Sequence, residues 1–251
     1  MKITVLGGCG AWPTAGAACS GFLVEHDGHR LLLDLGYATV PELLRHVTAD
    51  QVDAVLISHG HPDHCADLNP LLRARALAAE PAPALPVYAL PGALDAVLAL
   101  DRPGMLDHAL ALREFSAGDR LSVGPFTVDT RLLPHWVPNA GMRVAAGGRI
   151  LAYTGDTGPS PDVVELARDA DLLIADATYP EIVPPEDAAF LTSARQAARQ
   201  AAGAGAARLM LTHLWPGTPP ETAREAARKE FAGPITVAAN DIGLSLSTSR
   251  P

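Results

Sequence analysis

The hydrophobic positions in the first half of the chain form short apolar runs separated by turn residues. Runs at 3–7, 21–26 and 30–36 predict three strands, and the His-Asp-Gly turn between the last two predicts a hairpin. A longer apolar run at 52–58 predicts a buried strand that ends directly before a histidine-rich loop. The pattern also predicts helices at 41–47, 66–80 and 92–100 and a strand at 87–90.

The second half repeats this alternation. A strand is predicted at 126–133, and a hairpin over 141–156 turns at Gly147 and Gly148. The remaining pattern predicts helices at 161–170, 192–205 and 219–230 and strands at 171–178, 207–213, 234–239 and 243–247. No linker-like stretch divides the halves. Residues 1–251 are therefore expected to form a single domain, in which two β-rich halves pack face to face with helices outside.

Composition narrows the class of protein. The 251 residues are 48 % hydrophobic, which is ample for a sizeable core. The formal net charge of −9 argues against a surface for nucleic-acid polymers. Cys9, Cys19 and Cys65 are an odd number without CxxC spacing, so no disulfide framework is expected and a cytoplasmic protein fits better. No stretch approaches the ~20 apolar residues that span a membrane, so no membrane partner is expected.

The loop after residues 52–58 gathers four potential metal ligands in six positions, namely His59, His61, Asp63 and His64. Imidazole and carboxylate groups together suit Zn²⁺, Mn²⁺ or iron, and they do not suit Ca²⁺. A polar turn that caps the next helix would explain Asp63 but not three histidines. One zinc ion usually takes about four ligands, so this loop alone cannot fill two sites.

Later strand ends offer further ligands. His135, Asp156 and His213 all lie at or directly after the ends of predicted strands. Ligands usually bind in such loops at one edge of a layered α/β structure. These three residues are therefore the candidates that would complete a metal centre.

The segment His59-Gly60-His61-Pro62-Asp63-His64 resembles the HxHxDH motif of the metallo-β-lactamase-fold hydrolases. The segments "LLLDLG" (31–36), "YTGDTG" (153–158) and "LMLTHLWP" (209–216) resemble three further segments of this family. The resemblance is nearest to the ribonuclease Z-like group, which includes phosphodiesterases of small cyclic nucleotides. It implies an α/β fold, an αββα four-layer sandwich of two mixed β-sheets flanked by helices.

The resemblance also implies two divalent metal ions, with Zn²⁺ expected first and Mn²⁺ or iron as alternatives. The first ion would be held by His59, His61 and His135, the second by Asp63, His64 and His213, and Asp156 would bridge them. Two such ions lower the pKa of a bound water and so supply hydroxide at neutral pH. Asp63 and Asp156 are then the catalytic carboxylates, and no serine or cysteine nucleophile is needed.

Three other aspartates are candidates for supporting roles, either behind the metal ligands or at the start of a helix. Asp34 resembles the family's aspartate that accepts a hydrogen bond from a ligand histidine, and a plain strand-end turn is an equal alternative. Asp176 ends a strand and is a weaker candidate for a supporting role behind the metal ligands. Asp67 is expected to cap the helix that follows it.

One position departs from the family pattern. The ribonuclease Z-like group has a histidine in a short HxT element that assists phosphodiester cleavage, and here residues 190–192 read Phe-Leu-Thr. Phe190 cannot donate a proton, and losing a positioned acid or base costs about 10²–10⁴-fold in rate. An apolar substrate pocket is the other interpretation, lined by Trp136, Tyr179, Phe190 and Trp215.

The sequence therefore predicts a dinuclear metal-dependent hydrolase of a small phosphodiester such as a cyclic nucleotide. The alternative is a lactone, thioester or other carboxylic-ester hydrolase on the same metals, which Phe190 favours. A di-iron redox protein ranks lower because His61 is retained and no flavin partner domain is visible. A non-catalytic metal-binding protein ranks lower because the ligand set is complete. The expected partner is a small molecule, and a homodimer is left open.

Overall fold

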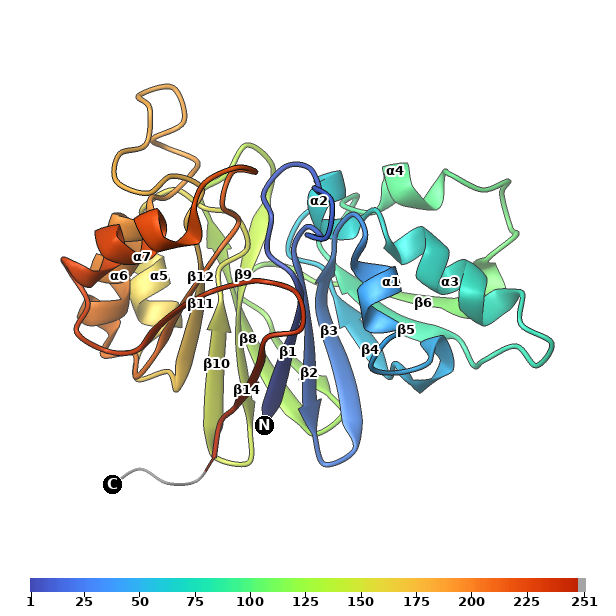
Figure 1. Cartoon of the computed structure of the whole chain (residues 1–251). Coiled ribbons are helices and arrows are strands. Elements are labelled where there is room, and N and C mark those ends of the chain that lie inside the picture. The colour runs from blue at the N-terminus through green and yellow to red at the C-terminus, as the bar shows by residue number, and fades with distance from the viewer. Residues whose placement is uncertain (248–251) are drawn as a thin grey trace. The chain divides into compact units, whose positions relative to one another are not determined.

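The structure is a computed structural model that describes residues 1–247, and its contacts divide the chain into two compact units (Figure 1). The N-terminal unit comprises Lys2–Ser116 and Ala239–Gly243. The C-terminal unit comprises Met1, Ala117–Ala238 and Leu244–Ser247. The expectation of a single domain over 1–251 stays a prediction.

One sheet has seven strands in the order β14-β1-β2-β3-β4-β5-β6, and its strands β1 to β6 belong to the N-terminal unit. Its strands are β1 (Lys2–Gly7), β2 (Gly21–His26), β3 (His29–Leu35), β4 (Ala54–Leu56), β5 (Leu85–Ala89), β6 (Leu110–Glu114) and β14 (Gly243–Ser245). Strands β1 to β3 pair antiparallel, and β3 to β6 pair parallel. The predicted hairpin between β2 and β3 is confirmed, with His26 opposite His29.

Four α-helices belong to this unit: α1 (Thr39–Leu43), α2 (Pro62–Cys65), α3 (Leu68–Ala76) and α4 (Asp95–Leu98). Single 3-10 turns lie at Ala49–Gln51 and Asp107–Ala109. Buried residues of α3 recur at helical spacing, at Leu68, Leu71 and Leu72, and pack with Leu32 and Val55 in one core. This apolar stripe holds the helix that follows the histidine loop against the sheet.

The sheet of the C-terminal unit has the order β13-β12-β11-β10-β9-β8-β7. Its strands are β7 (Arg120–Val123), β8 (Phe126–Leu133), β9 (Asn139–Ala146), β10 (Arg149–Tyr153), β11 (Leu172–Asp176), β12 (Leu209–Thr212) and β13 (Ile235–Val237). Strands β7 to β10 pair antiparallel, and β10 to β13 pair parallel. The predicted turn at Gly147 and Gly148 joins β9 to β10.

Helices α5 (Pro161–Leu166), α6 (Ala194–Ala204) and α7 (Pro220–Arg228) share one core with β10, β11 and β12. The buried face of α6 consists of alanines, whose small side chains let the helix lie close to its neighbours. Helix α6 ends at its C-cap, Gly205, which has a φ of 68°, the left-handed conformation in which glycine commonly ends a helix.

Sequence patterning missed strands β6 and β7, which are the edge strands of their sheets. Their residues are mostly exposed or half-buried, so they carry too few apolar positions to stand out. Each unit is a mixed seven-stranded sheet with helices, as the resemblance implied. Within residues 1–247, no helix combines the length and the apolarity that crossing a membrane requires.

Candidate metal centre

The histidine loop lies at the carboxyl end of β4, beside the carboxyl end of β3. The parallel register pairs Leu33 with Leu56, so the two strand ends are adjacent, and the Asp34 carboxylate reaches Ser58 by hydrogen bonds. Asp34 is fully buried and has a φ of 58°, a left-handed conformation that is rare outside glycine. Such strain persists only where the surrounding structure enforces it, and it is frequent at functional sites.

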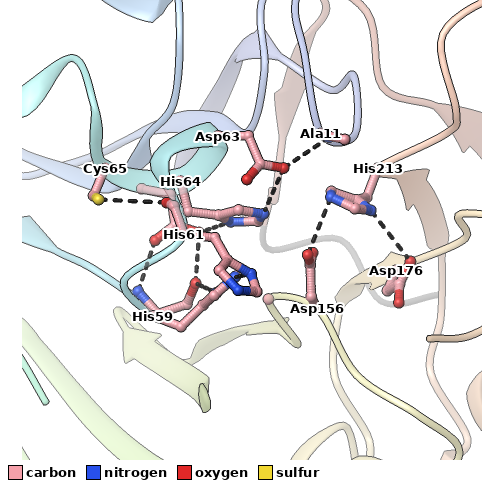
Figure 2. Close-up of polar contacts among 12 residues, drawn as sticks. Ala11, His59, His61, Asp63, His64, Cys65, Asp156, Asp176 and His213 are labelled. Carbon is pink, nitrogen blue, oxygen red and sulfur yellow. Dashed lines mark hydrogen bonds and ion pairs between the residues drawn. The ribbon is translucent and has the colours of Figure 1, made fainter. Parts of the chain in front are cut away.

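The Asp34 carboxylate accepts three hydrogen bonds from this loop (Figure 2 draws the neighbouring contacts). The backbone N–H of Ser58 donates to Oδ1 at 2.7 Å. The Ser58 hydroxyl and the Nδ1 of His64 both donate to Oδ2, each at 2.7 Å. A single buried carboxylate therefore fixes the start of the loop and one of its histidines.

These contacts determine which nitrogen of each histidine carries its proton. His64 donates from Nδ1 to Asp34, which leaves the Nε2 lone pair available. The single proton of the Ser58 hydroxyl goes to Asp34, so Ser58 Oγ accepts from His59 Nδ1 at 3.0 Å. His59 Nε2 is therefore also a lone-pair donor. Fixing the tautomer in this way is what ligand histidines require.

The remaining two candidate ligands of the loop lie against the same histidines. His59 Nε2 lies 3.1 Å from His61 Nδ1, and Asp63 Oδ2 lies 3.7 Å from His64 Nε2. The backbone N–H of Ala11 donates to Asp63 Oδ2 at 2.7 Å. All four predicted ligands of residues 59–64 thus have side chains within reach of a neighbouring candidate.

Backbone packing holds the loop in place. Pro62 begins α2, where its fixed φ favours a helix start. Gly36 lies directly under this turn, and a Cβ at Gly36 would collide with the carbonyl group of Asp63. This close approach explains the glycine at the end of "LLLDLG".

The prediction that Asp67 caps the helix after it is wrong. Helix α3 begins next to Asp67 but receives no side-chain cap hydrogen bond. The carboxylate of Asp67 instead accepts from the backbone N–H of Val40 at 2.8 Å, near the start of α1. The Asp67 carboxylate therefore accepts from the start of α1, which is distant in sequence but is brought next to Asp67 by the fold.

Thiol labelling should separate the three free cysteines, Cys9, Cys19 and Cys65. Burial raises the pKa of Cys65 to about 12, and it raises the pKa of Cys19 further. Both thiols stay protonated up to pH 9, and the thiolate is the reactive form. Burial also raises the pKa of Cys9, but this thiol is only half-buried. We therefore expect Ellman's reagent at pH 8 to modify Cys9 slowly and to spare the other two until denaturant is added. Rapid modification of all three thiols in the folded protein would contradict the burial.

The other three predicted ligands lie at the carboxyl ends of parallel strands in the C-terminal unit. Asp156 follows β10, and His213 follows β12. The register pairs Tyr153 with Ile174 and Asp176 with Thr212, so these strand ends are adjacent. His213 has a φ of 62°, a second left-handed position in a non-glycine residue.

Asp156 faces both histidines of this unit. Its Oδ2 lies 3.1 Å from His213 Nε2 (Figure 2). The same oxygen lies 3.8 Å from His135 Nε2. All three side chains are at least nine-tenths buried. The structure therefore brings together the three predicted ligands from β8–β9, β10 and β12.

The Nδ1 atom of each of these histidines donates a hydrogen bond to an acceptor on the side away from Asp156. His135 Nδ1 donates to the backbone carbonyl of Phe190 at 3.0 Å. The Thr178 hydroxyl donates to Asp176 Oδ1 at 2.7 Å, so it accepts from His213 Nδ1 at 2.8 Å. Both Nε2 lone pairs therefore face the Asp156 carboxylate. Burial raises the pKa of Asp176, the nearby Asp156 carboxylate adds to the rise, and the hydrogen bonds from Thr178 and Thr157 oppose it.

Three supporting residues were not predicted from the sequence. Ser58 and Thr178 provide the hydroxyls described above. Asn139 is fully buried, and its side-chain amide donates to the carbonyls of Thr154 and Asp156 at 2.9 and 2.6 Å. The sequence signal for Ser58 was its place directly before His59. Nothing in the sequence pattern singles out Asn139.

The predicted aromatic pocket separates into two ring pairs. Trp136 and Phe190 have ring centroids 5.2 Å apart, and Tyr179 and Trp215 have centroids 6.3 Å apart. Trp136, which is 49 % exposed, lines a cavity of about 440 Å³ together with His135 and the apolar residues Leu133 and Pro134. Of the four aromatic residues, only Trp136 is among those that line this cavity.

The donor chemistry within each unit fits a divalent metal ion. A lone pair on His213 Nε2 and a carboxylate oxygen 3.1 Å away repel each other unless a proton or a cation lies between them. His59 Nε2 and His61 Nδ1 converge in the same way. Buried imidazole and carboxylate groups of this kind suit Zn²⁺, Mn²⁺ or iron.

Comparison with known proteins identifies the family. The family model "Beta-lactamase superfamily domain" matches residues 29–214. The chain is 31 % identical over 241 residues to "Probable metallo-hydrolase YhfI" of Bacillus subtilis, covering 95 % of this chain and 97 % of that one. It is 29 % identical to a ribonuclease Z of Myxococcus xanthus, covering 95 % of each chain.

Solved structures agree with the family match. The crystal structure of the metallo-β-lactamase fold protein YhfI from Bacillus subtilis matches with a TM-score of 0.89 and 29 % identity. The match covers 97 % of this chain and 98 % of that one. The fold implied by the HxHxDH resemblance is therefore confirmed. This chain belongs to the β-lactamase superfamily and is a metal-dependent hydrolase.

Proposed function

We propose that this hydrolase cleaves a small phosphodiester, such as a cyclic nucleotide, with two divalent metal ions held by its seven predicted ligands. Zn²⁺ is the first choice of ion, and Mn²⁺ or iron are alternatives. The observation that carries the proposal is the set of oriented histidines. In His59, His64, His135 and His213 an acceptor on Nδ1 leaves the Nε2 lone pair for a metal.

Family membership supports a shared centre. The ligand groups at 59–64 and at the strand ends of the C-terminal unit resemble, in order, the metal-binding segments of metallo-β-lactamase-fold hydrolases, and all of them lie within the matched residues 29–214. Seven side chains with a bridging carboxylate are enough for two ions of about four ligands each. Asp156 is the proposed bridge because its Oδ2 faces both histidines of its own unit.

Bound ions would lower the pKa of a water molecule and neutralise charge on the substrate. The chain's own part is to fix donor directions and exclude water. Asp34 and Asp176 are fully buried, so the hydrogen bonds that they accept lie in surroundings of low dielectric constant. Hydrolysis would form one bond from the water oxygen to phosphorus and break one phosphorus–oxygen ester bond.

The choice of a phosphodiester rests on a relative that matches this chain nearly end to end. The Myxococcus xanthus relative is named ribonuclease Z, and the match spans 95 % of both chains. The net charge of −9 disfavours a long polyanionic RNA. A small phosphodiester is the substrate class that satisfies both observations. The proposed partner is therefore a small molecule, and the homodimer stays a prediction.

Phe190 favours a second candidate, the hydrolysis of a lactone, thioester or other carboxylic ester. Its ring packs against Trp136, and its backbone carbonyl holds His135. The carbonyl contact needs no particular side chain, so position 190 can lack a histidine without loss of this support. An acyl substrate needs no proton donor at position 190 if its leaving group is already acidic, as a thiol is.

A substrate panel on the purified protein with added zinc or manganese tests the proposal. We expect turnover of cyclic AMP or bis-(p-nitrophenyl) phosphate by the native protein and a loss of this activity in His61→Ala. Turnover of a lactone or thioester with both phosphodiesters untouched would overturn the phosphodiester assignment in favour of the ester. No turnover of any substrate by protein with a full metal complement would contradict both.

A further inference from the structure

The Asp176 carboxylate, at the end of β11, accepts four hydrogen bonds inside the C-terminal unit. Oδ1 accepts from the backbone N–H of Thr178 at 2.9 Å and from its hydroxyl at 2.7 Å. Oδ2 accepts from the backbone N–H groups of Thr157 and Thr192 at 3.2 and 3.1 Å. The side chain is fully buried, so these contacts are made out of water, where each is stronger.

Each residue that donates to Asp176 is linked to a predicted metal ligand, either directly or through one intervening residue. Thr157 directly follows Asp156. The Thr178 hydroxyl accepts from Nδ1 of His213. Thr192 lies two residues after Phe190, whose carbonyl accepts from Nδ1 of His135. The three loops that carry or orient these ligands are therefore tied to one carboxylate.

The loops are also joined to each other. The Thr192 hydroxyl donates to the carbonyl of Thr157 at 2.5 Å. The Thr154 hydroxyl accepts from the backbone N–H of Asp176 at 3.0 Å. A displacement of Asp176 would therefore move the loops around Asp156 and Phe190 together.

A turn at the end of a strand is the simpler explanation for Asp176. An aspartate often accepts from the backbone N–H two residues later, and the contact with Thr178 has that form. The turn does not account for Thr157 and Thr192, which lie 19 positions before and 16 positions after Asp176. Two long-range backbone contacts on a single oxygen indicate that the carboxylate joins separate loops.

We propose that Asp176 is the positioning residue of this half of the metal centre, acting on Asp156, His135 and His213 at once. It touches none of the reacting atoms. It fixes the tautomer of His213 through the Thr178 hydroxyl, and it holds the backbone on which the other two depend. The inference rests on the proposed function only in taking these three residues as metal ligands.

The test compares four variants of the full chain: Asp176→Asn, Thr178→Val, Thr178→Ser and Thr212→Val. Thr212→Val is the matched control, because the buried Thr212 hydroxyl has no hydrogen-bond partner among residues 1–247. The readouts are zinc affinity by chelator competition and the tautomer of each histidine by nitrogen-15 NMR. Circular dichroism checks that each variant is folded.

We expect Asp176→Asn to weaken zinc binding by about 10–100-fold, as the loss of an orienting partner typically does. The nitrogen signals of both His135 and His213 should shift in this variant. In Thr178→Val only the His213 signal should change, Thr178→Ser should restore it, and Thr212→Val should match the native protein. Native zinc affinity in a folded Asp176→Asn protein would overturn the inference.

Two further outcomes would also decide between the possibilities. If Asp176→Asn does not fold, the Thr178 pair decides, and an unchanged His213 tautomer in Thr178→Val would overturn the inference. The proposed function fails differently, because in that case His213→Ala would bind as much zinc as the native protein. Loss of zinc in His213→Ala together with native affinity in Asp176→Asn would refute the positioning role alone.

Discussion

Replacing Asp156 with alanine is expected to reduce the metal content of the purified protein from about two ions per chain to well below that. The Oδ2 atom of Asp156 faces Nε2 of both His135 and His213, so one substitution removes the anion that both histidines share. Charge stabilisation by metal ions is worth several kcal/mol in a transition state. At about 1.4 kcal/mol per factor of ten, hydrolysis should fall by about 10³-fold.

Elemental analysis of the native protein and of Asp156→Ala checks this expectation. Asp129→Asn is a suitable control in the same unit, because that partly exposed carboxylate pairs with Arg120 at the sheet edge. The control should keep the native metal content and rate. An unchanged metal content in Asp156→Ala would refute the site as proposed, whatever the effect on activity.

Replacing Asp34 with asparagine is expected to destabilise the metal-free protein as well as to weaken metal binding. The carboxylate accepts from the Ser58 N–H, the Ser58 hydroxyl and His64 Nδ1, all of them in the interior. A buried donor left without its acceptor costs about 1–3 kcal/mol. We expect the free energy of unfolding to fall by about 3 kcal/mol, a large part of the 5–15 kcal/mol typical of proteins. Metal affinity should fall by about 10–100-fold.

Denaturant unfolding of the metal-free protein separates the first effect from the second. Asp27→Asn is the matched control, because Asp27 also has a positive φ, of 48°, in the turn between β2 and β3. Its side chain is 77 % exposed, so the control tests the backbone conformation without the buried contacts. Equal unfolding free energies for native protein and Asp34→Asn would show that the network around Asp34 does not stabilise the fold.

The ligand types were predictable from the sequence because their spacing is local. His59, His61, Asp63 and His64 lie within six positions, and a chain of ordinary composition rarely places three histidines so close together. The adjacency of Asp156 and His213 depends on strand register, since β10, β11 and β12 pair in parallel. Their place at strand ends indicated one sheet edge, and the 3.1 Å separation required the fold.

Most of the hydrogen-bond partners that orient the ligand histidines could not be predicted from the sequence. Ser58 is a single serine at the end of an apolar run, and its role appears only because parallel pairing brings the ends of β3 and β4 together, within reach of the Asp34 carboxylate. From the sequence, Phe190 is only a position that lacks the family's functional histidine. The structure shows that its backbone carbonyl orients His135, a contact that no side-chain pattern encodes.

The sequence by itself determined the fold family, the ligand types and the alternation of strands and helices, because those depend on local spacing and hydrophobic periodicity. Only the tertiary structure decided which acceptor lies behind each histidine, and thus which nitrogen is left for a metal. From the sequence, Asp67 is expected to cap α3, whereas its carboxylate accepts from the start of α1, and Asp176 is only a weak candidate for a supporting role. Both carboxylates accept from backbone groups that are distant along the chain, and only folding brings such groups together.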